Sequence, residues 1–496
     1  MSSAATETAA PAVPRRTGWA LRPRLPLLAV LALFVFGGLG HEDRRVVERE
    51  FKTGHYRLSP AWALRAVRGF LTNDDDMYHF HAYAQATFGR PYKSFFIRSR
   101  EGWQAFFARG QQEDPDGTPV VTPARPLRPY RDFLIEYPPG ALLPILSPGL
   151  VATTADGYER VFKLEMALCL WLLLGQLEQL ARRLGADEAV VARLPRAFAA
   201  AVFALGIVCT HRFDGMVGVC LAGAVLAAAR DRPITAGVVL GLGVLIKGVP
   251  LLIIPPVAAY LYAQHGWRSA ARLLVVAGAT VLGLFVATWL WFGGGIFDGL
   301  SYQRDRPLQV ESTPSALLAL LAWLRPGLVS VVYSFGSSNL DGRPVIVLGA
   351  LIPLLSAAAT GAAVLLVVAR LGRLRGGSGA DDRARLMALV EGSVLVLAVQ
   401  LASGKVFCPQ YLMWLMPFGL VAAFGAGRPA RWRWTGLALL AATQLIYPFA
   451  YAAVKSLTPW ASALVLGRNL GLVAWASLLM FADQPEAATA PVPANA

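Results

Sequence analysis

The chain has 496 residues, of which 55% are hydrophobic and only 16% are charged, and its mean hydropathy is +0.49. A soluble protein usually carries roughly 25% charged residues, so this composition excludes a soluble globular domain and indicates a polytopic membrane protein. The formal net charge of +15 does not indicate a nucleic-acid partner, because the arginines recur in short loops between apolar stretches instead of gathering in one soluble segment.

Many apolar stretches reach or approach the roughly 20 residues that a membrane-spanning helix needs. They are residues 25–40, 161–179, 197–210, 216–229, 235–246, 251–262, 273–291, 345–369, 386–403, 411–424, 437–453 and 464–480. The pattern predicts an all-α polytopic bundle of about twelve transmembrane helices. The last stretch is the weakest, because Arg468 and Asn469 interrupt it.

This spacing divides the chain into five parts. We expect a cytoplasmic disordered tail at 1–23, a first transmembrane helix at 24–40, an extracytoplasmic loop at 41–158, a transmembrane bundle at 159–480 and a second disordered tail at 481–496. Both tails are rich in alanine, proline and threonine, which is typical of disorder. The first apolar run is interpreted as a retained anchor, since about two dozen residues precede it and no clear small-x-small cleavage site follows it.

Basic residues alternate from loop to loop along the chain. They occur before residue 25 and near 182, 230, 268, 370–385 and 428–433, which is the positive-inside pattern. The pattern predicts cytoplasmic termini and places the other loops outside, and a helical bundle implies the inner (plasma) membrane. Those outer loops carry nearly all clusters of mixed charge, so we expect one extracytoplasmic working face. A channel is disfavoured, because its polar residues should continue to a second mouth.

Within the large first loop, four elements are expected. Residues 59–71 show the spacing of a surface helix, and residues 77–88 predict a second interfacial helix whose start the preceding aspartates could cap. The segment 99–128 is rich in glycine, proline and charge and is interpreted as a flap. Residues 141–151 are apolar but too short to cross, so we expect a half-buried element on the outer side.

Three adjacent aspartates, Asp74, Asp75 and Asp76, precede the expected helix at 77–88. Carboxylates at the mouth of a membrane bundle are costly unless they have a role, which suggests chemistry on a lipid-linked substrate. Each one alone could equally be a helix N-cap. For the cluster we favour catalysis, because one cap needs only one of three like charges.

Six motifs in alternate outer loops resemble those of the GT-C glycosyltransferases that use polyprenyl-phosphate sugars, and in particular the family 87 mannosyltransferase-like proteins. They are Asp76 with Phe80, Tyr83 and Gly89-Arg90-Pro91-Tyr92; Tyr130-Arg131-Asp132-Phe133 with Glu136-Tyr137-Pro138-Pro139-Gly140; Arg212-Phe213-Asp214; Lys247 with Pro250; Arg306 to Ser312; and Cys408-Pro409-Gln410-Tyr411 with Trp414. The likeness covers roughly residues 70–420. Two departures stand out: residues 93–130 separate motifs that the family usually joins directly, and Cys408 stands where the family usually has serine.

The resemblance implies a GT-C-like bundle with a large extracytoplasmic first loop, and an inverting transfer of mannose or another hexose or pentose. The acceptor would be an extracytoplasmic glycan, glycolipid or protein, and the donor would be a polyprenyl-phosphate sugar in the membrane lipid. Asp76 is our first choice as general base, with Asp74 second and Asp75 third. The cations that could bind the donor phosphate are Lys247, Arg306, Arg212 and Lys405, although snorkelling to the headgroups is an alternative for each. Residues that could contact the sugar or acceptor, or hold the cations, are Glu136, Tyr137, Asp214, Gln309, Glu311, Gln410 and Tyr411.

No cofactor or metal is expected. His79 and His81 invite a metal hypothesis, but a spacing of two residues puts them on different sides of a helix, so a divalent ion is possible but not favoured. No P-loop or Rossmann glycine fingerprint occurs, and the four scattered cysteines indicate neither a disulfide framework nor a zinc site.

Two other functions stay open. A transporter or lipid flippase could use the acidic cluster as a coupling site, but it should carry ionisable residues at mid-membrane and show repeat symmetry. Glu391 is the main such residue here. A glycan polymerase or ligase would share the outer site but would use a pyrophosphate-linked donor.

Overall fold

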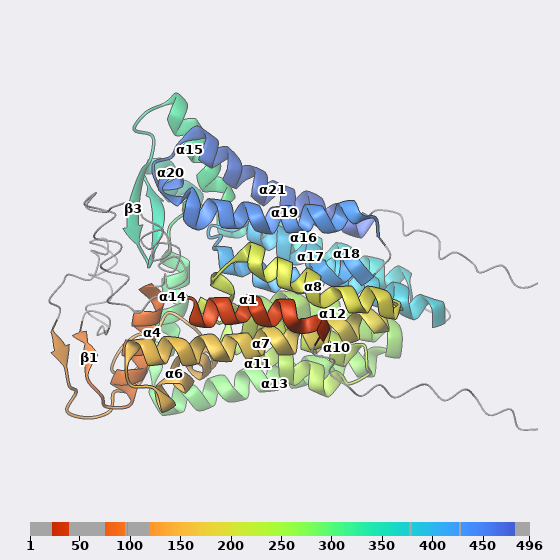
Figure 1. The fold of residues 1–496 in the computed structure, drawn as a ribbon, viewed down its shortest axis with the longest axis horizontal. Helices are drawn as coiled ribbons and strands as arrows, with labels where there is room; N and C mark the ends of the chain where they lie inside the picture. Colours follow the sequence, from red (N-terminus) through yellow and green to blue (C-terminus); the bar gives the residue numbers. More distant parts are fainter. Residues whose placement is uncertain are drawn as a thin grey trace, which may run out of the picture.

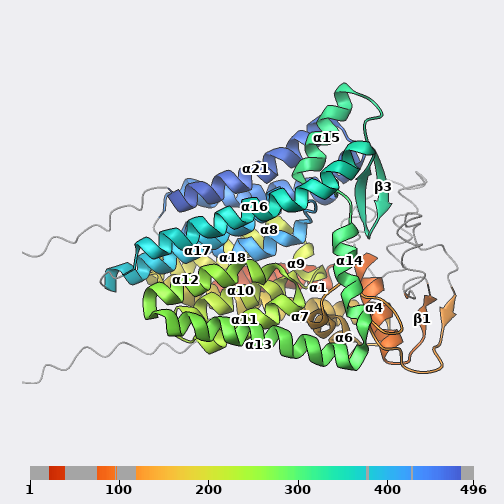
Figure 2. The ribbon, with the colours of Figure 1, turned by 180° about the vertical axis from the view of Figure 1, so that it is seen from behind.

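The computed structural model describes residues 22–38, 75–94, 97, 119–375, 379–425 and 428–481. This part is a bundle of helices lying side by side, seen from opposite directions in Figures 1 and 2. Helices α4, α6 and α14 and the strands lie at one end of the bundle, which we call the β end. The predicted all-α membrane fold is confirmed, since the described residues contain only two small two-stranded sheets.

The elements follow one another along the chain with short connections. The first half contains α1 (Leu25–Phe36), α4 (Asp75–Thr87), β1 (Tyr92–Lys93), β2 (Val120–Val121), α6 (Leu142–Val151), α7 (Ala155–Arg183), α8 (Glu188–Leu205), α9 (Val208–His211), α10 (Asp214–Ala228) and α11 (Pro233–Ile246). The second half contains α12 (Ile254–His265), α13 (Trp267–Phe292), α14 (Asp298–Asp305), α15 (Thr313–Leu324), β3 (Ser330–Ser334), β4 (Ser337–Asp341), α16 (Arg343–Arg373), α17 (Gly379–Ser403), α18 (Leu412–Gly425), α19 (Ala430–Gln444), α20 (Tyr451–Lys455) and α21 (Pro459–Phe481). Both strand pairs, β1 with β2 and β3 with β4, are antiparallel.

Every apolar stretch named above overlaps a helix. Among the described residues, four helical segments are long and apolar enough to cross a membrane: Trp267–Phe292, Arg343–Arg373, Asp382–Ser403 and Pro459–Phe481. The chain is therefore a multi-pass membrane protein. The number of about twelve spans stays a prediction, because several of the other helices are short.

Three of these short helices, α10, α11 and α18, lie together in the middle of the bundle, where α10 packs against both α11 and α18. They have 15, 14 and 14 residues, so each is only about 21–23 Å long at 1.5 Å per residue, less than the roughly 30 Å of hydrocarbon. In space, the first residue of α10 lies beside the end of α11. α18 begins at the same end of the bundle, after the turn Pro409–Tyr411. Polar residues at these helix ends therefore lie close together.

The bundle has a buried centre and a lipid-facing side. In the most apolar window of α17, 83% of the residues are buried, whereas in α13 only 11% are. α17 packs against α16, α18 and α21, and α13 packs against α11 and α12. An apolar helix that exposes most of its surface faces lipid, so α13 lies on the outside of the bundle.

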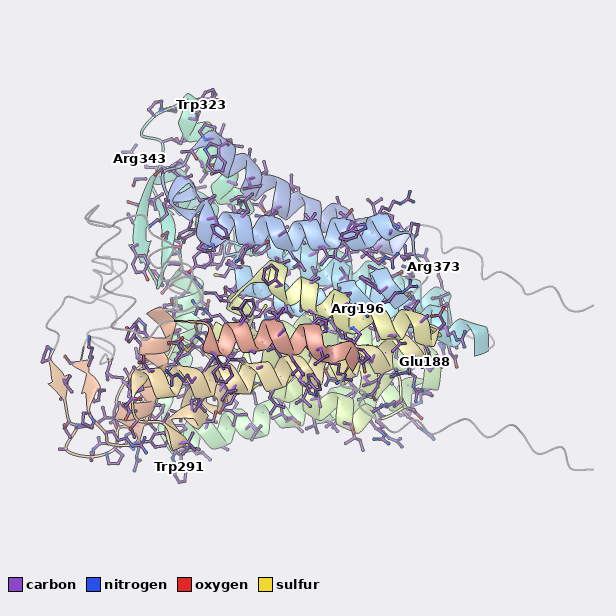
Figure 3. All side chains as sticks on the ribbon, viewed as in Figure 1. Glu188, Arg196, Trp291, Trp323, Arg343 and Arg373 are labelled. Atoms are coloured by element: carbon purple, nitrogen blue, oxygen red, sulfur yellow. The ribbon has the colours of Figure 1, made fainter. Side chains whose placement is uncertain are left out.

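The labelled side chains of Figure 3 distinguish the two ends. Trp291, Trp323 and Arg343 lie at the β end, while Glu188 and Arg373 lie at the opposite end. The segment 297–343 and the basic group 370–385 thus lie at opposite ends, as loop parity predicts. Which end faces the cytoplasm stays a prediction.

The expected elements of the first loop have different outcomes. The helix predicted at 77–88 is confirmed as α4, and the apolar element at 141–151 is α6, which packs against α4 and α7 at the β end. The helix predicted at 59–71 lies outside the described residues. So does most of the flap, whose last part supplies β2 as the partner of β1.

Residues 297–343 form a folded cap that the sequence did not predict. After α14 come α15 and the β3–β4 hairpin, in which Ser330 pairs with Asp341 and Ser334 with Ser337. Their apolar side chains share a second hydrophobic cluster with α20 and α21, separate from the main core. This cap covers the β end beside the ends of the short helices.

Candidate active site

A buried ion pair joins the ends of α10 and α11. Lys247, the residue after α11, places its Nζ 2.8 Å and 3.1 Å from the two carboxylate oxygens of Asp214, the first residue of α10. Trp414 donates its indole N–H to the same carboxylate at 2.7 Å. The Asp214 side chain is 1% exposed and the Lys247 side chain 17%. The Asp214 carboxylate thus binds the Lys247 ammonium from inside the protein, and the opposite side of the ammonium stays partly exposed.

Three aromatic rings surround the Lys247 ammonium. Its Nζ lies 5.4 Å from the Phe213 ring centroid, 4.8 Å from that of Tyr411 and 5.2 Å from that of Trp414. Tyr411 and Trp414 are stacked with centroids 4.3 Å apart. A cation within about 6 Å of an aromatic face is attracted to it, so this cage fixes the position of the charge.

Helix α4 joins this cage through Phe80. The Phe80 ring lies 5.9 Å from both Tyr137 and Phe213, and those two rings are 5.0 Å apart. Tyr83, one turn later, donates its hydroxyl to Glu136 Oε2 at 3.2 Å. Burial raises the pKa of Glu136 above its usual value, against the opposing effects of the Tyr83 hydroxyl and Arg306. The structure therefore brings Glu136 and Tyr137 to the site.

Gly140 allows the loop that carries Glu136 and Tyr137 to touch α11. A Cβ at this position would lie 2.6 Å from the carbonyl carbon of Leu245 and 2.8 Å from the nitrogen of Ile246, directly before Lys247. Both contacts are to backbone, which has little room to move. Glycine is required where two backbones approach so closely.

We expect Gly140→Ala to push this loop away from the end of α11. The predicted result is a clear fall in the melting temperature of the purified protein, together with a loss of any activity that depends on Lys247. Thermal unfolding in detergent measures the first effect. Gly278→Ala on α13 is the control, because nothing lies within 4 Å of a Cβ there. Equal melting temperatures for both variants would contradict this account.

Arg306 and Arg212 lie near Cys408, and Lys405 lies near Arg306. The Cys408 thiol lies within electrostatic range of Arg306 and Lys247, and Arg212 lies within range of both Cys408 and Asp214. Arg306 donates from Nη2 to Ser337 Oγ of the hairpin at 3.0 Å. Lys405 donates to the Arg304 carbonyl oxygen at 2.5 Å. Burial and the nearby Arg306 lower the pKa of Lys405, as expected for cations that crowd one another.

Gln309 and Glu311 hold the site loops from behind. The Gln309 backbone nitrogen donates to the Lys405 carbonyl oxygen at 2.9 Å, and the Gln309 side-chain oxygen accepts from the Phe407 backbone nitrogen at 3.1 Å. Glu311 pairs with Arg468 of α21 at 3.6 Å. The Arg468 guanidinium also lies 3.8 Å from the Phe407 ring centroid. These contacts join the segments that carry Arg306 and Cys408. We therefore infer that Gln309 and Glu311 position these loops.

We expect the Glu311 carboxyl to make stability depend on pH. Its burial outweighs the attraction of Arg468 and raises its pKa to about 7. A carboxyl whose pKa is raised on folding stabilises the protein fully below its usual pKa, and that stability is lost as the pH rises through the folded pKa. The melting temperature of the parent should therefore fall between about pH 4.5 and 7 more than that of Glu311→Gln. Parallel curves would contradict this prediction.

The remaining predicted residues have less structural detail. Gln410 lies in the turn Pro409–Tyr411, between Cys408 and the cage. Asp74 lies outside the described residues, and Asp75 and Asp76 are described only as the first turn of α4. The structure thus brings together the predicted cations and Glu136, Tyr137, Asp214, Gln309, Glu311 and Tyr411, while the roles of all these residues stay predictions.

One ring nitrogen of His81 is engaged by neighbouring polar groups of the protein. Its Nε2 lies 3.0 Å from the Thr153 carbonyl oxygen and 2.9 Å from Gln85 Nε2, and burial lowers its pKa. Within the described ranges, no group of three histidine, cysteine or acidic side chains is arranged to hold a metal.

Several residues of the site were missed from the sequence. Phe213 and Trp414 were noted only as parts of motifs, and Arg468 was treated as an interruption of the last apolar stretch. The sequence signal that could have identified Arg468 was its charge, because an arginine inside an apolar helix needs a buried partner. In the structure that partner is Glu311.

The fold and the site together define an α-helical multi-pass membrane protein with a cation-rich polar site at one end of its bundle. Residues 133–400, more than half of the chain, match the model of glycosyltransferase family 87, and the chain belongs to this family. It is therefore a membrane glycosyltransferase, which implies a sugar donor and an acceptor. No curated protein matches the chain.

Proposed function

We propose that the protein is an inverting hexosyl- or pentosyltransferase that takes its sugar from a polyprenyl-phosphate donor. The acceptor is an extracytoplasmic glycan, glycolipid or protein, and the β end faces away from the cytoplasm of the inner (plasma) membrane. The observation that carries this proposal is the grouping of Lys247, Arg306, Arg212 and Lys405 at helix ends close to Cys408 or to one another, where a lipid phosphate at the membrane surface could reach them. Cations around a phosphate stabilise the negative charge that develops as it departs.

In the proposed reaction, Asp76 accepts the proton of an acceptor hydroxyl. The oxygen attacks the anomeric carbon, and the bond from that carbon to the phosphate oxygen breaks on the opposite face, so the polyprenyl phosphate leaves with the electron pair. Arg306 and Arg212 neutralise the leaving phosphate. The Lys247 ammonium, already balanced by Asp214, positions the sugar or the phosphate by hydrogen bonds.

The position of α4 supports Asp76 as the base. Position 76 precedes Phe80 by four residues, which places the two on one face of the helix, and Phe80 contacts Tyr137 and Phe213 beside the Lys247 cage. Position 75 is rotated from this face by about 100°. We assign Glu136, with its raised pKa, the role of donating or accepting a hydrogen bond with a sugar hydroxyl.

The surroundings of Glu391 disfavour a transporter. Glu391 of α17 is fully buried but is paired with both Arg370, at 3.1 Å, and Arg428. Both arginines come from the basic segments that loop parity assigns to the other end of the bundle. A carboxylate held by two arginines is a structural cluster and a poor site for reversible ion coupling.

The donor class can be tested with purified protein in liposomes. Labelled sugar should move from a polyprenyl-monophosphate sugar to acceptor in a membrane extract, and the product should have the opposite anomeric configuration. Arg306→Gln should reduce this transfer strongly, while Arg325→Gln, on the cap but outside the cation group, is the matched control. Transfer only from a nucleotide sugar, or only from a pyrophosphate-linked donor, would refute the proposal.

Cys408 offers a test of orientation, because it is the only partly exposed cysteine of the four and the others are buried. We expect a membrane-impermeant maleimide added outside intact cells to label the parent and to inhibit transfer. Cys408→Ser should be neither labelled nor inhibited. Labelling only after the membrane has been opened would place the site on the cytoplasmic side and contradict the proposed orientation.

A further inference from the structure

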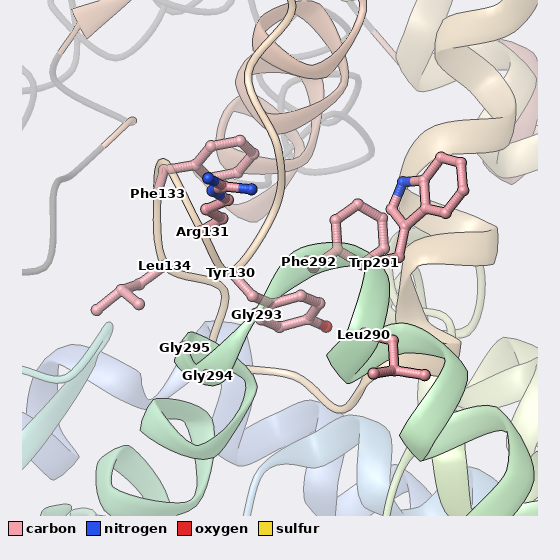
Figure 4. Close-up of a pocket in the computed structure, with 10 residues that line it drawn as sticks. All are labelled: Tyr130, Arg131, Phe133, Leu134, Leu290, Trp291, Phe292, Gly293, Gly294 and Gly295. Carbon is pink, nitrogen blue, oxygen red and sulfur yellow. The ribbon is translucent and has the colours of Figure 1, made fainter.

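A pocket of about 320 Å³ lies beside the site, between the loop of residues 130–134 and the glycine turn that follows α13. Figure 4 shows its walls: Tyr130, Arg131, Phe133 and Leu134 on one side, and the end of α13 with Gly293 to Gly295 on the other. Its volume is within the range of small-ligand pockets, roughly 300–1,000 Å³. Neither the proposed catalysis nor the cation group uses it.

The pocket opens at the level where headgroups of the membrane are expected. α13 is mostly exposed along its length, and Leu290 and Trp291 at its end are 73% and 72% exposed. Exposed tryptophan at the end of a lipid-facing helix is typical of the membrane–water interface. A ligand of this pocket can therefore have its acyl chains along α13 and its polar head beside Arg131.

The lining is cationic. Among the described residues that line the pocket, Arg131 is the one charged group. The neighbouring carboxylate of Asp132 is already bound by Arg125 through hydrogen bonds of 2.8 Å and 2.9 Å and by the Arg128 backbone nitrogen at 2.7 Å. An exposed guanidinium in a pocket whose lining residues include no carboxylate, although Asp132 and Asp298 lie nearby, matches a phosphate, to which arginine can donate two parallel hydrogen bonds.

We propose that this pocket binds the phosphate headgroup of an anionic membrane phospholipid, with Arg131 as its main contact. The site is separate from the one proposed for the donor. It is nevertheless joined to it, because Tyr130 in the pocket wall donates its hydroxyl to the Tyr137 carbonyl at 2.9 Å, and Tyr137 contacts Phe213. Bound lipid therefore steadies the loop that carries Glu136 and Tyr137.

The test measures lipid binding directly and does not depend on the proposed reaction. Purified protein is mixed with dioleoyl phosphatidylglycerol or dioleoyl phosphatidylcholine, and the lipid-bound fraction is measured by native mass spectrometry. The parent should retain phosphatidylglycerol in preference to phosphatidylcholine. Arg131→Gln should bind it about 10-fold more weakly, as expected for the loss of a charge-assisted hydrogen-bonded contact, while Arg128→Gln, an exposed arginine that does not line the pocket, should behave like the parent.

A second variant fills the pocket without removing charge. Nothing lies within 4 Å of a Cβ at Gly294, so Gly294→Leu should fold normally and weaken phosphatidylglycerol binding, whereas Gly278→Leu on α13 should not. Phosphatidylglycerol should also raise the melting temperature of the parent but not that of Arg131→Gln. Equal binding of the two lipids, or equal losses in the Arg131 and Arg128 variants, would overturn the proposal.

Discussion

Replacing Asp76 with asparagine is expected to lower the rate of sugar transfer by about 10²–10⁴-fold, the usual contribution of a positioned general base. Asparagine has nearly the same size but cannot accept the hydroxyl proton. α4 begins at Asp75, so Asp76 lies inside the first turn and is not the N-cap residue, and a large loss of activity would not report a lost cap. The measurement is the initial rate of transfer from a polyprenyl-monophosphate sugar, with the melting temperature of each variant beside it.

The neighbouring aspartates are the controls for this experiment. Asp75→Asn should transfer sugar at nearly the parental rate, because position 75 is on another face of α4 from Phe80. A large loss in Asp74→Asn with normal activity in Asp76→Asn would move the base to Asp74. If none of the three variants lost more than a few-fold, the general-base proposal would be wrong.

Removing the Lys247 ammonium is expected to affect both stability and activity. Lys247→Met leaves the Asp214 carboxylate buried without its cation, which typically costs about 3–5 kcal/mol of folding free energy. Adding Asp214→Asn removes the uncompensated charge and keeps an oxygen for the Trp414 N–H. The double variant should therefore recover most of the melting temperature lost by Lys247→Met.

Activity then distinguishes a structural from a functional lysine. We expect the double variant to remain almost inactive although it is folded, because no ammonium is left in the cage formed by Phe213, Tyr411 and Trp414. A folded double variant that transfers sugar at the parental rate would show that Lys247 serves only to neutralise Asp214. The single variant Asp214→Asn, with its lysine still present, should lie between these extremes.

Much of the site could be predicted because loop parity is a strong constraint. Apolar stretches must cross or pack in the membrane, so polar motifs in alternate loops must reach the same end of the bundle. This argument placed Lys247, Arg306 and Lys405 at one end, and in the structure Lys247 and Arg306 lie near Cys408 while Lys405 lies near Arg306. The short element at 141–151 was predicted by the same reasoning, whereas the helix at 77–88 was predicted from its own residues and the aspartates before it.

Other features could not be predicted from single segments. The pairing of Glu311 with Arg468 joins residues far apart in the chain, and neither residue carries a local signal that names its partner. The aromatic cage could not be predicted for the same reason, since Phe213 lies far along the chain from Tyr411 and Trp414. The folded cap at 297–343 was missed because its helices and hairpin are short and share their apolar contacts with α20 and α21.

The composition of the chain and the alternation of its loops were enough to establish a multi-pass membrane protein with its polar motifs at one end, because the cost of placing charge in hydrocarbon is a property of each segment alone. Which of these polar groups touch depends on how the helices pack. The carboxylate that holds Lys247, the glycine contact that sets the Glu136 loop against α11 and the pocket beside Arg131 exist only once the bundle has formed, since each is made by residues from different segments of the chain.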